Sequence, residues 1–128
     1  MQNPDEIPRK VTGIRHLFAA QRYSASGARR LWQEAAFRHE CLAMLASVVF
    51  FAIIGASVAR FLILIGVFLI VVALEALNTA IEEIIDRISP EFSATGRHAK
   101  DLGSFAVFCG LLAWGILMLD TTVRVIVG

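Results

Sequence analysis

The sequence lacks the features of several common classes of small protein. Its only two cysteines, Cys41 and Cys109, have no CxxC spacing and no neighbouring His or Cys ligands, which favours packing roles over a disulfide or metal site. A net charge of +1 implies no polyelectrolyte partner overall. Residues 1–8 are polar and the first apolar block begins only near residue 41, so we expect no N-terminal signal peptide.

Apolar sequence, by contrast, is abundant. The 128 residues are 57% hydrophobic with a mean hydropathy of +0.68, whereas ordinary soluble domains are about 45–50% apolar. The excess lies in uncharged blocks at 41–59, 61–74 and 102–119. The second block is too short to cross about 30 Å of hydrocarbon, so its helix must continue into the polar segment that follows. We therefore predict a single all-α membrane domain over 1–128, with spans at about 41–59, 61–86 and 102–122.

The cations are segregated. Seven of the Lys and Arg residues lie in residues 1–40 and three lie between the second and third spans, while only Arg60 and Arg124 lie on the other side. By the positive-inside rule the N-terminus and the 86–101 loop are expected in the cytoplasm, and the C-terminus outside.

The first 40 residues show helical periodicity. Apolar side chains recur at helical spacing in two stripes, Ile14–Phe18 and Ala28–Ala35, with Arg residues on the other faces. We predict an amphipathic helix over about 11–40 lying on the cytoplasmic leaflet, interrupted at Ser24–Gly27. The alternative is a soluble helical cap.

The polar end of the second span has one face of chemical interest. Glu75, Asn78, Thr79, Glu82 and Asp86 fall on a single side of a helix. A charged residue in mid-span costs about 2.5–3.5 kcal/mol, so such residues are usually functional. Carboxylate and amide oxygens suit Mg²⁺ and the phosphates that it carries. The alternative is that these polar groups only join helices in an oligomer.

Other segments can complete this face. Lys100, in the loop before the third span, is a candidate phosphate contact or a lysine that reaches the membrane surface. Glu34 and Glu40, just before the first span, are candidates for a second carboxylate at a metal.

Taken together, these segments resemble the bacterial integral-membrane diacylglycerol kinase family, which includes the undecaprenol kinases. The segments that carry the resemblance are Glu75-Ala-Leu-Asn-Thr-Ala-Ile-Glu82, Asp86-Arg87, Lys100-Asp101-Leu-Gly-Ser104 and Glu34-Ala-Ala-Phe-Arg-His-Glu40. The resemblance implies a homotrimer in the bacterial inner membrane, with composite sites that transfer the γ-phosphate of ATP to a lipid hydroxyl. It also implies no Gly-rich phosphate loop, and the sequence contains no GxxxxGK[ST].

The resemblance further implies roles for individual residues. Glu75 is expected to be the general base, supported by Asn78, and Glu34 and Glu82 are expected to bind Mg²⁺. ATP binding is implied for Arg15, Tyr23, Glu34, Glu82, Glu91, Lys100 and Asp101. Lipid binding is implied for Ala36, Phe37, Arg38, His39, Glu40, Glu75 and Ser104.

Three functional hypotheses follow. The first is a diacylglycerol kinase, which the segment 36–40 favours over the related undecaprenol kinase. The second is a small cation or proton transport subunit, but a transport path needs polar groups across both halves of the bilayer. The third is a purely structural membrane oligomer, which does not explain Glu75, Glu82 and Lys100 together.

Overall fold

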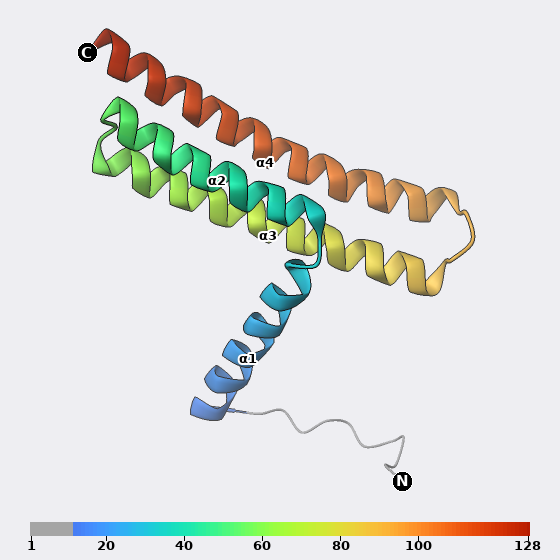
Figure 1. Ribbon diagram of the computed structural model, residues 1–128. Coiled ribbons are helices and arrows are strands. Elements are labelled where there is room, and N and C mark those ends of the chain that lie inside the picture. Colours follow the sequence, from blue (N-terminus) through green and yellow to red (C-terminus); the bar gives the residue numbers. More distant parts are fainter. Residues whose placement is uncertain (1–11) are drawn as a thin grey trace. The chain divides into compact units, whose positions relative to one another are not determined.

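The computed structural model describes residues 12–128, and the start of the predicted surface helix at residue 11 lies outside that range. Four helices follow one another: α1 (Ile14–Leu31), α2 (Ala35–Ile54), α3 (Val58–Ile88) and α4 (Ala94–Val127) (Figure 1). The prediction of an all-α chain is confirmed. The chain divides into two compact units, one ending at Arg30 and the other covering Leu31–Gly128, which contains α2, α3 and α4.

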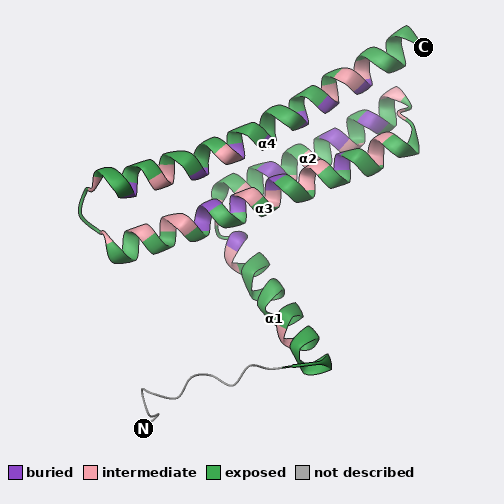
Figure 2. Cartoon of the chain, turned by 180° about the vertical axis from the view of Figure 1, so that it is seen from behind, coloured by how far each residue is buried: buried purple, intermediate pink, exposed green. Residues whose placement is uncertain are grey.

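The unit that ends at Arg30 consists of most of α1. This helix is continuous through Ser24–Gly27, so the predicted interruption there is wrong. One glycine costs about 1 kcal/mol relative to alanine in a helix and serine costs less, which is too little to end a helix of this length. Nearly all of α1 is exposed, including its apolar residues Leu17 and Phe18 (Figure 2).

The chain breaks instead at residues 32–34, between α1 and α2. The Arg38 guanidinium donates hydrogen bonds from Nη1 to the carbonyls of Trp32, at 2.8 Å, and Gln33, at 2.9 Å. The Phe37 ring meets the Trp32 ring edge to face, with centroids 6.0 Å apart. These contacts fix the entry into α2, so residues 35–40 belong to that helix.

Within residues 12–128 three helices, α2, α3 and α4, are long and apolar enough to cross a membrane. Gly55 ends α2 in the left-handed conformation, with φ of 70°, and Ser57 precedes α3. The first uncharged block, 41–59, therefore contains most of a helix and also the turn after it. At about 1.5 Å per residue, α3 and α4 are about 46 and 51 Å long. Both exceed the hydrocarbon thickness of about 30 Å and must project beyond it.

The closest helix pair is α3 and α4, and glycine makes this close packing possible. Buried Gly96, Gly103 and Gly110 recur every seven residues, which is two helical turns, along the face of α4 that meets α3. A Cβ added at Gly110 would lie 3.1 Å from both Leu74 Cδ1 and Val71 Cγ2. Small residues of this kind let membrane helices approach backbone to backbone.

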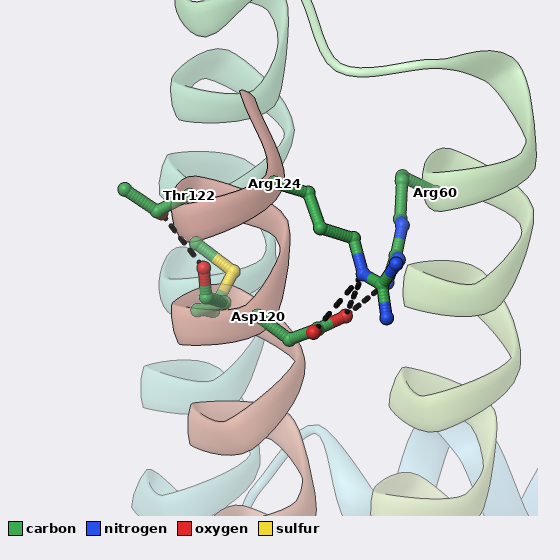
Figure 3. Close-up of polar contacts among 5 residues, drawn as sticks. Arg60, Asp120, Thr122 and Arg124 are labelled. Atoms are coloured by element: carbon green, nitrogen blue, oxygen red, sulfur yellow. Dashed lines mark hydrogen bonds and ion pairs between the residues drawn. The ribbon is translucent and has the colours of Figure 1, made fainter. Parts of the chain in front are cut away.

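The apolar core lies toward the end of the bundle where α2 turns into α3, which we call the turn end. Its buried residues are Phe51, Leu64, Val71, Trp114 and Leu117. At the same end Asp120 of α4 accepts hydrogen bonds from Arg60 of α3, at 2.7 Å, and from Arg124, at 2.9 Å (Figure 3). The opposite end, where residues 89–93 join α3 to α4, is called the loop end.

Candidate functional site

A groove of about 710 Å³ opens among the three long helices. Its lining comes from the start of α2, from the middle of α3 and from the first half and middle of α4, with Glu34 at its rim. The lining residues are Glu34, Ala36, His39, Glu40, Ala43, Ser47, Glu75, Asn78, Glu82, Ser104, Val107, Leu111, Trp114 and Gly115. The groove therefore brings together side chains that are distant in the sequence.

The acidic part of the groove contains the helix face that the sequence singled out. Glu75 and Asn78 are buried, with 6% and 8% of their surface exposed, and Glu82 is half-buried one turn further along α3. Asn78 donates from Nδ2 to Glu82 Oε1 at 3.2 Å. Asp86, which the sequence places on the same face, is exposed and lies outside this groove.

Four carboxylates line this one groove, and their charges repel one another. Glu34 and Glu82 both lie within electrostatic range of Glu75. Glu40, of which 7% is exposed, is in turn repelled by Glu75. None of Glu40, Glu75 and Glu82 forms an ion pair with any residue in the described range 12–128. The acidic side chains of Glu40, Glu75 and Glu82, buried or half-buried without an ion-pair partner among residues 12–128, form a site for a positively charged ligand or a proton donor.

Two buried acceptor atoms at this site have no hydrogen-bond donor. They are Glu40 Oε2 and Asn78 Oδ1, and neither has a partner among residues 12–128. An unpaired buried acceptor costs about 1–3 kcal/mol, so these atoms are placed to accept from a ligand hydroxyl or water.

Gly103 of α4 fixes the position of the Asn78 side chain. A Cβ at Gly103 would collide with Asn78 Oδ1, and it would lie 3.3 Å from Cγ. The absence of a side chain at this position of α4 therefore makes room for the amide beside Glu82. Sequence reasoning placed Gly103 in a motif segment but gave it no role, because the register of α4 against α3 decides which residue faces Asn78.

The other end of the groove is apolar. Val107, Leu111, Trp114 and Gly115 of α4 face Ala43 and Ser47 of α2 there. Buried Trp114 donates from Nε1 to Ser47 Oγ at 3.1 Å. Sequence reasoning missed both residues because a Trp and a Ser inside uncharged blocks look like ordinary membrane-span residues.

A second pocket, of about 340 Å³, lies at the loop end. It is lined by Ile85, Asp86, Ser89, Pro90, Glu91, Phe92, Ser93, Gly96, Arg97 and Lys100. The Lys100 ammonium donates to Asp86 Oδ1, which joins the end of α3 to the start of α4. Ser93 caps α4, because its Oγ accepts from the Gly96 amide at 3.0 Å. The loop-end pocket thus brings Lys100 and several polar groups together beyond the acidic groove.

The remaining predicted site residues lie elsewhere. Phe37 and Arg38 do not line the groove and contact the break at residues 32–34, as described above. Asp101 is exposed and lines neither pocket. Arg15 and Tyr23 lie on α1, in the other unit, beside a surface hollow of about 360 Å³.

The donor set at the groove can be compared with what Mg²⁺ requires. Within residues 12–128 no group of three or more His, Cys, Asp or Glu side chains is arranged to hold a metal ion. Glu34 and Glu82 nevertheless both line the groove. Mg²⁺ in phosphate-transferring sites is usually bound by one or two carboxylates, with substrate phosphates and waters completing the shell. The residues present therefore fit a magnesium ion that arrives with a nucleotide.

Three membrane-spanning helices around an acidic groove define a polytopic membrane protein with a site of carboxylate and amide side chains. A family model described as prokaryotic diacylglycerol kinase matches residues 22–120. The chain belongs to this family, as the resemblance of its motifs predicted.

Named relatives agree with this assignment. A diacylglycerol kinase from Sinorhizobium sp is 55% identical over 107 residues, covering 84% of this chain and 78% of the relative. A diacylglycerol kinase from Haemophilus influenzae is 39% identical, covering 84% and 92%. The diacylglycerol kinase of Escherichia coli K12 is 37% identical, covering 84% and 93%.

Proposed function

We propose that this protein is a lipid kinase that transfers the γ-phosphate of ATP to diacylglycerol and produces phosphatidic acid. The observation that carries the proposal is the groove in which Glu75, Asn78 and Glu82 lie buried or half-buried within a membrane-spanning helix. A lipid hydroxyl can reach this groove from the bilayer. The names of the relatives support diacylglycerol as the acceptor.

Glu75 is the proposed general base. The hydroxyl oxygen of diacylglycerol forms a bond to the γ-phosphorus, while the bond from that phosphorus to the β–γ bridging oxygen breaks and ADP leaves with the electron pair. The hydroxyl proton passes to the buried carboxylate of Glu75, which lines the groove. Asn78 positions the acidic face through its hydrogen bond to Glu82.

Glu34 and Glu82 are the proposed ligands of Mg²⁺. When bound, the ion neutralises charge on the phosphates, which is the main requirement of phosphoryl transfer. Glu34 and Glu82 would hold the ion, and with it the phosphates, at the groove near Glu75. The absence of a third protein ligand within residues 12–128 leaves coordination positions for phosphate oxygens.

The nucleotide is proposed to bind toward the loop end. Lys100 and Glu91 line the loop-end pocket, and Asp101 follows Lys100 on α4. Lys100 is paired with Asp86 but remains partly exposed, with 38% of its side-chain surface accessible, so its other N–H donors are available to phosphate. Arg15 and Tyr23 of α1 are proposed to contribute further nucleotide contacts.

Ala36, His39, Glu40 and Ser104 are proposed to surround the lipid hydroxyl end, since all four line the groove. The unpaired Glu40 Oε2 offers an acceptor for a glycerol hydroxyl. Phe37 and Arg38 are proposed to act on lipid binding through residues 32 and 33, because Arg38 bonds both carbonyls and Phe37 packs against the Trp32 ring.

The setting in the membrane is part of the proposal. We place the protein in the bacterial inner membrane as a multi-pass protein, with the N-terminus and the loop end in the cytoplasm, because Lys and Arg gather on that side. The helix α1 is proposed to lie on the cytoplasmic leaflet, with Leu17 and Phe18 among its apolar contacts. A homotrimer is proposed, since the groove is open and composite sites between subunits would close it.

The test is a phosphorylation assay in mixed micelles with labelled ATP, with and without Mg²⁺, offering diacylglycerol and undecaprenol separately. We expect labelled phosphatidic acid only when ATP and Mg²⁺ are both present. Preferential labelling of undecaprenol would move the substrate to the other branch of the family. No transfer to either lipid alcohol would overturn the kinase proposal.

A further inference from the structure

The groove extends well beyond the groups assigned to phosphoryl transfer. From Ser104 to Gly115 along α4 is about 16 Å at 1.5 Å per residue, and from Glu40 to Ser47 along α2 is about 10 Å. Over this length the lining changes from carboxylates to Val107, Leu111 and Trp114. Phosphoryl transfer uses only the first part, so the apolar part must serve another purpose.

A hydrogen-bonded bridge between α4 and α2 lies in the lining of the apolar part. Trp114 donates from Nε1 to Ser47 Oγ, and Ser47 in turn donates to the Ala43 carbonyl at 2.7 Å, so both polar side chains are satisfied. The Trp114 ring meets the Phe68 ring edge to face, at a centroid distance of 5.8 Å, with the apolar core around it. This bridge between α4 and α2 is therefore held from two sides.

Gly115 follows Trp114 in the apolar part of the groove. It lines the groove, and a Cβ placed there would meet nothing within 4 Å. This differs from Gly103, where a Cβ would collide with Asn78 of α3, and from Gly110, where a Cβ would lie 3.1 Å from Leu74 and Val71. Helix packing therefore does not require glycine at residue 115, and a larger side chain there would occupy open space beside the groove.

We propose that Gly115 and the Trp114–Ser47 bridge set the acyl-chain length that the enzyme phosphorylates best. This inference rests on the proposed function, and the proposed occupant of the apolar part of the groove is an acyl chain of diacylglycerol. The chain is attached to the glycerol whose hydroxyl is placed at Glu75, and the groove continues from Glu75 into the span, where only apolar ligand groups are stable.

The test compares Gly115→Ala and Gly115→Leu with wild type on dioctanoyl, dilauroyl and dipalmitoyl glycerol in mixed micelles. Gly66→Leu is the matched control, because Gly66 is also an exposed helical glycine with nothing within 4 Å of its Cβ but does not line the groove. The readouts are kcat/KM for each lipid and KM for ATP.

We expect Gly115→Leu to lower kcat/KM for dipalmitoyl glycerol by about tenfold relative to dioctanoyl glycerol. Each methylene group that can no longer be buried changes the affinity by up to about fourfold. The displacement of two methylene groups from the groove therefore accounts for the tenfold effect. Gly115→Ala shifts the ratio less, in the same direction, and KM for ATP is unchanged. The control keeps the wild-type ratio.

An unchanged ratio of long-chain to short-chain kcat/KM in both Gly115 variants would overturn the inference, as would an equal shift in Gly66→Leu. If Gly115→Leu is inactive on every lipid, the ratio measured for Gly115→Ala decides. Failure of the proposed function is distinguishable, because in that case the wild-type protein phosphorylates none of the three lipids.

Discussion

The turn end of the helical bundle and the acidic groove differ in whether their carboxylates are paired with cationic side chains. At the turn end, the Asp120 carboxylate is neutralised by Arg60 and Arg124, with contacts of 2.7 and 2.9 Å. In the groove, Glu40 and Glu75 are less exposed than Asp120, yet neither they nor Glu82 form an ion pair within residues 12–128. Arginine side chains thus pair with the partly accessible carboxylate of Asp120, whereas the most buried carboxylates, those of Glu40 and Glu75, have no such partner within residues 12–128.

This difference separates a structural use of charge from a functional one. A carboxylate that joins two helices needs its cation in the same chain, because an unpaired charge within an apolar bundle is costly. A carboxylate that must receive a proton or a metal needs that position left open. The stability lost at the groove is therefore attributable to its proposed chemistry. Mutations in the groove and mutations at the turn end should have different consequences.

The largest effect is expected for Glu75→Gln. The amide keeps the shape of the side chain but cannot accept the lipid proton, so kcat should fall by about 10²–10⁴-fold. ATP binding, measured by protection of the protein against thermal unfolding, should be largely retained. Glu83→Gln, one helical position beyond Glu82 and exposed, is the control and should retain activity. Near wild-type turnover by Glu75→Gln would show that another group is the base.

A smaller loss is expected for Gly103→Ala. The added methyl collides with the Asn78 side chain and displaces the amide that is bonded to Glu82, and a displacement of about 1 Å in a catalytic site can cost about 10²-fold in rate. Gly110→Ala is the matched variant, because its methyl crowds only the apolar Leu74 and Val71. It should lower thermal stability and reduce kcat less. If both variants reduce kcat equally, packing alone explains the effect and Asn78 has no special role.

Next in size is Lys100→Ala, which tests the loop-end pocket. Removing the ammonium takes away a charged donor to phosphate and leaves Asp86 without its partner. A hydrogen bond to a charged group contributes about 1.5–3 kcal/mol, so KM for ATP should rise about tenfold or more while KM for the lipid changes little. Arg87→Ala, an exposed cation in the last turn of α3, is the control. A rise in the lipid KM instead would place Lys100 on the lipid side.

The smallest effect on activity is expected for Asp120→Asn. The substitution weakens the link between Arg60 and Arg124, so the thermal unfolding temperature should fall while kcat and both KM values stay at wild-type levels. The difference in unfolding temperature should shrink at high salt, because this site is partly exposed and salt screens it. A loss of activity comparable to that of Glu75→Gln would contradict the division of roles between the groove and the turn end.

Much of the site was predictable because its determinants are local. The spacing of Glu75, Asn78 and Glu82 places them on one helical face wherever the helix packs, and all three line the groove. Glu34 and Glu40, which precede the first uncharged block, line it too. Their catalytic and binding roles remain predictions. Residues 55–57 were harder to place, because an uncharged block conceals a turn when only charge is counted.

The sequence by itself determined the class of architecture, since long uncharged runs must form helices in a bilayer, where backbone groups have no water to bond. It also determined which side of α3 is polar. The tertiary structure alone decided that Trp114 meets Ser47, that Gly103 makes room for Asn78, and that Asp120 finds Arg60. Each of these pairs joins two helices, and partners across helices depend on the register in which the helices pack, which no local pattern specifies.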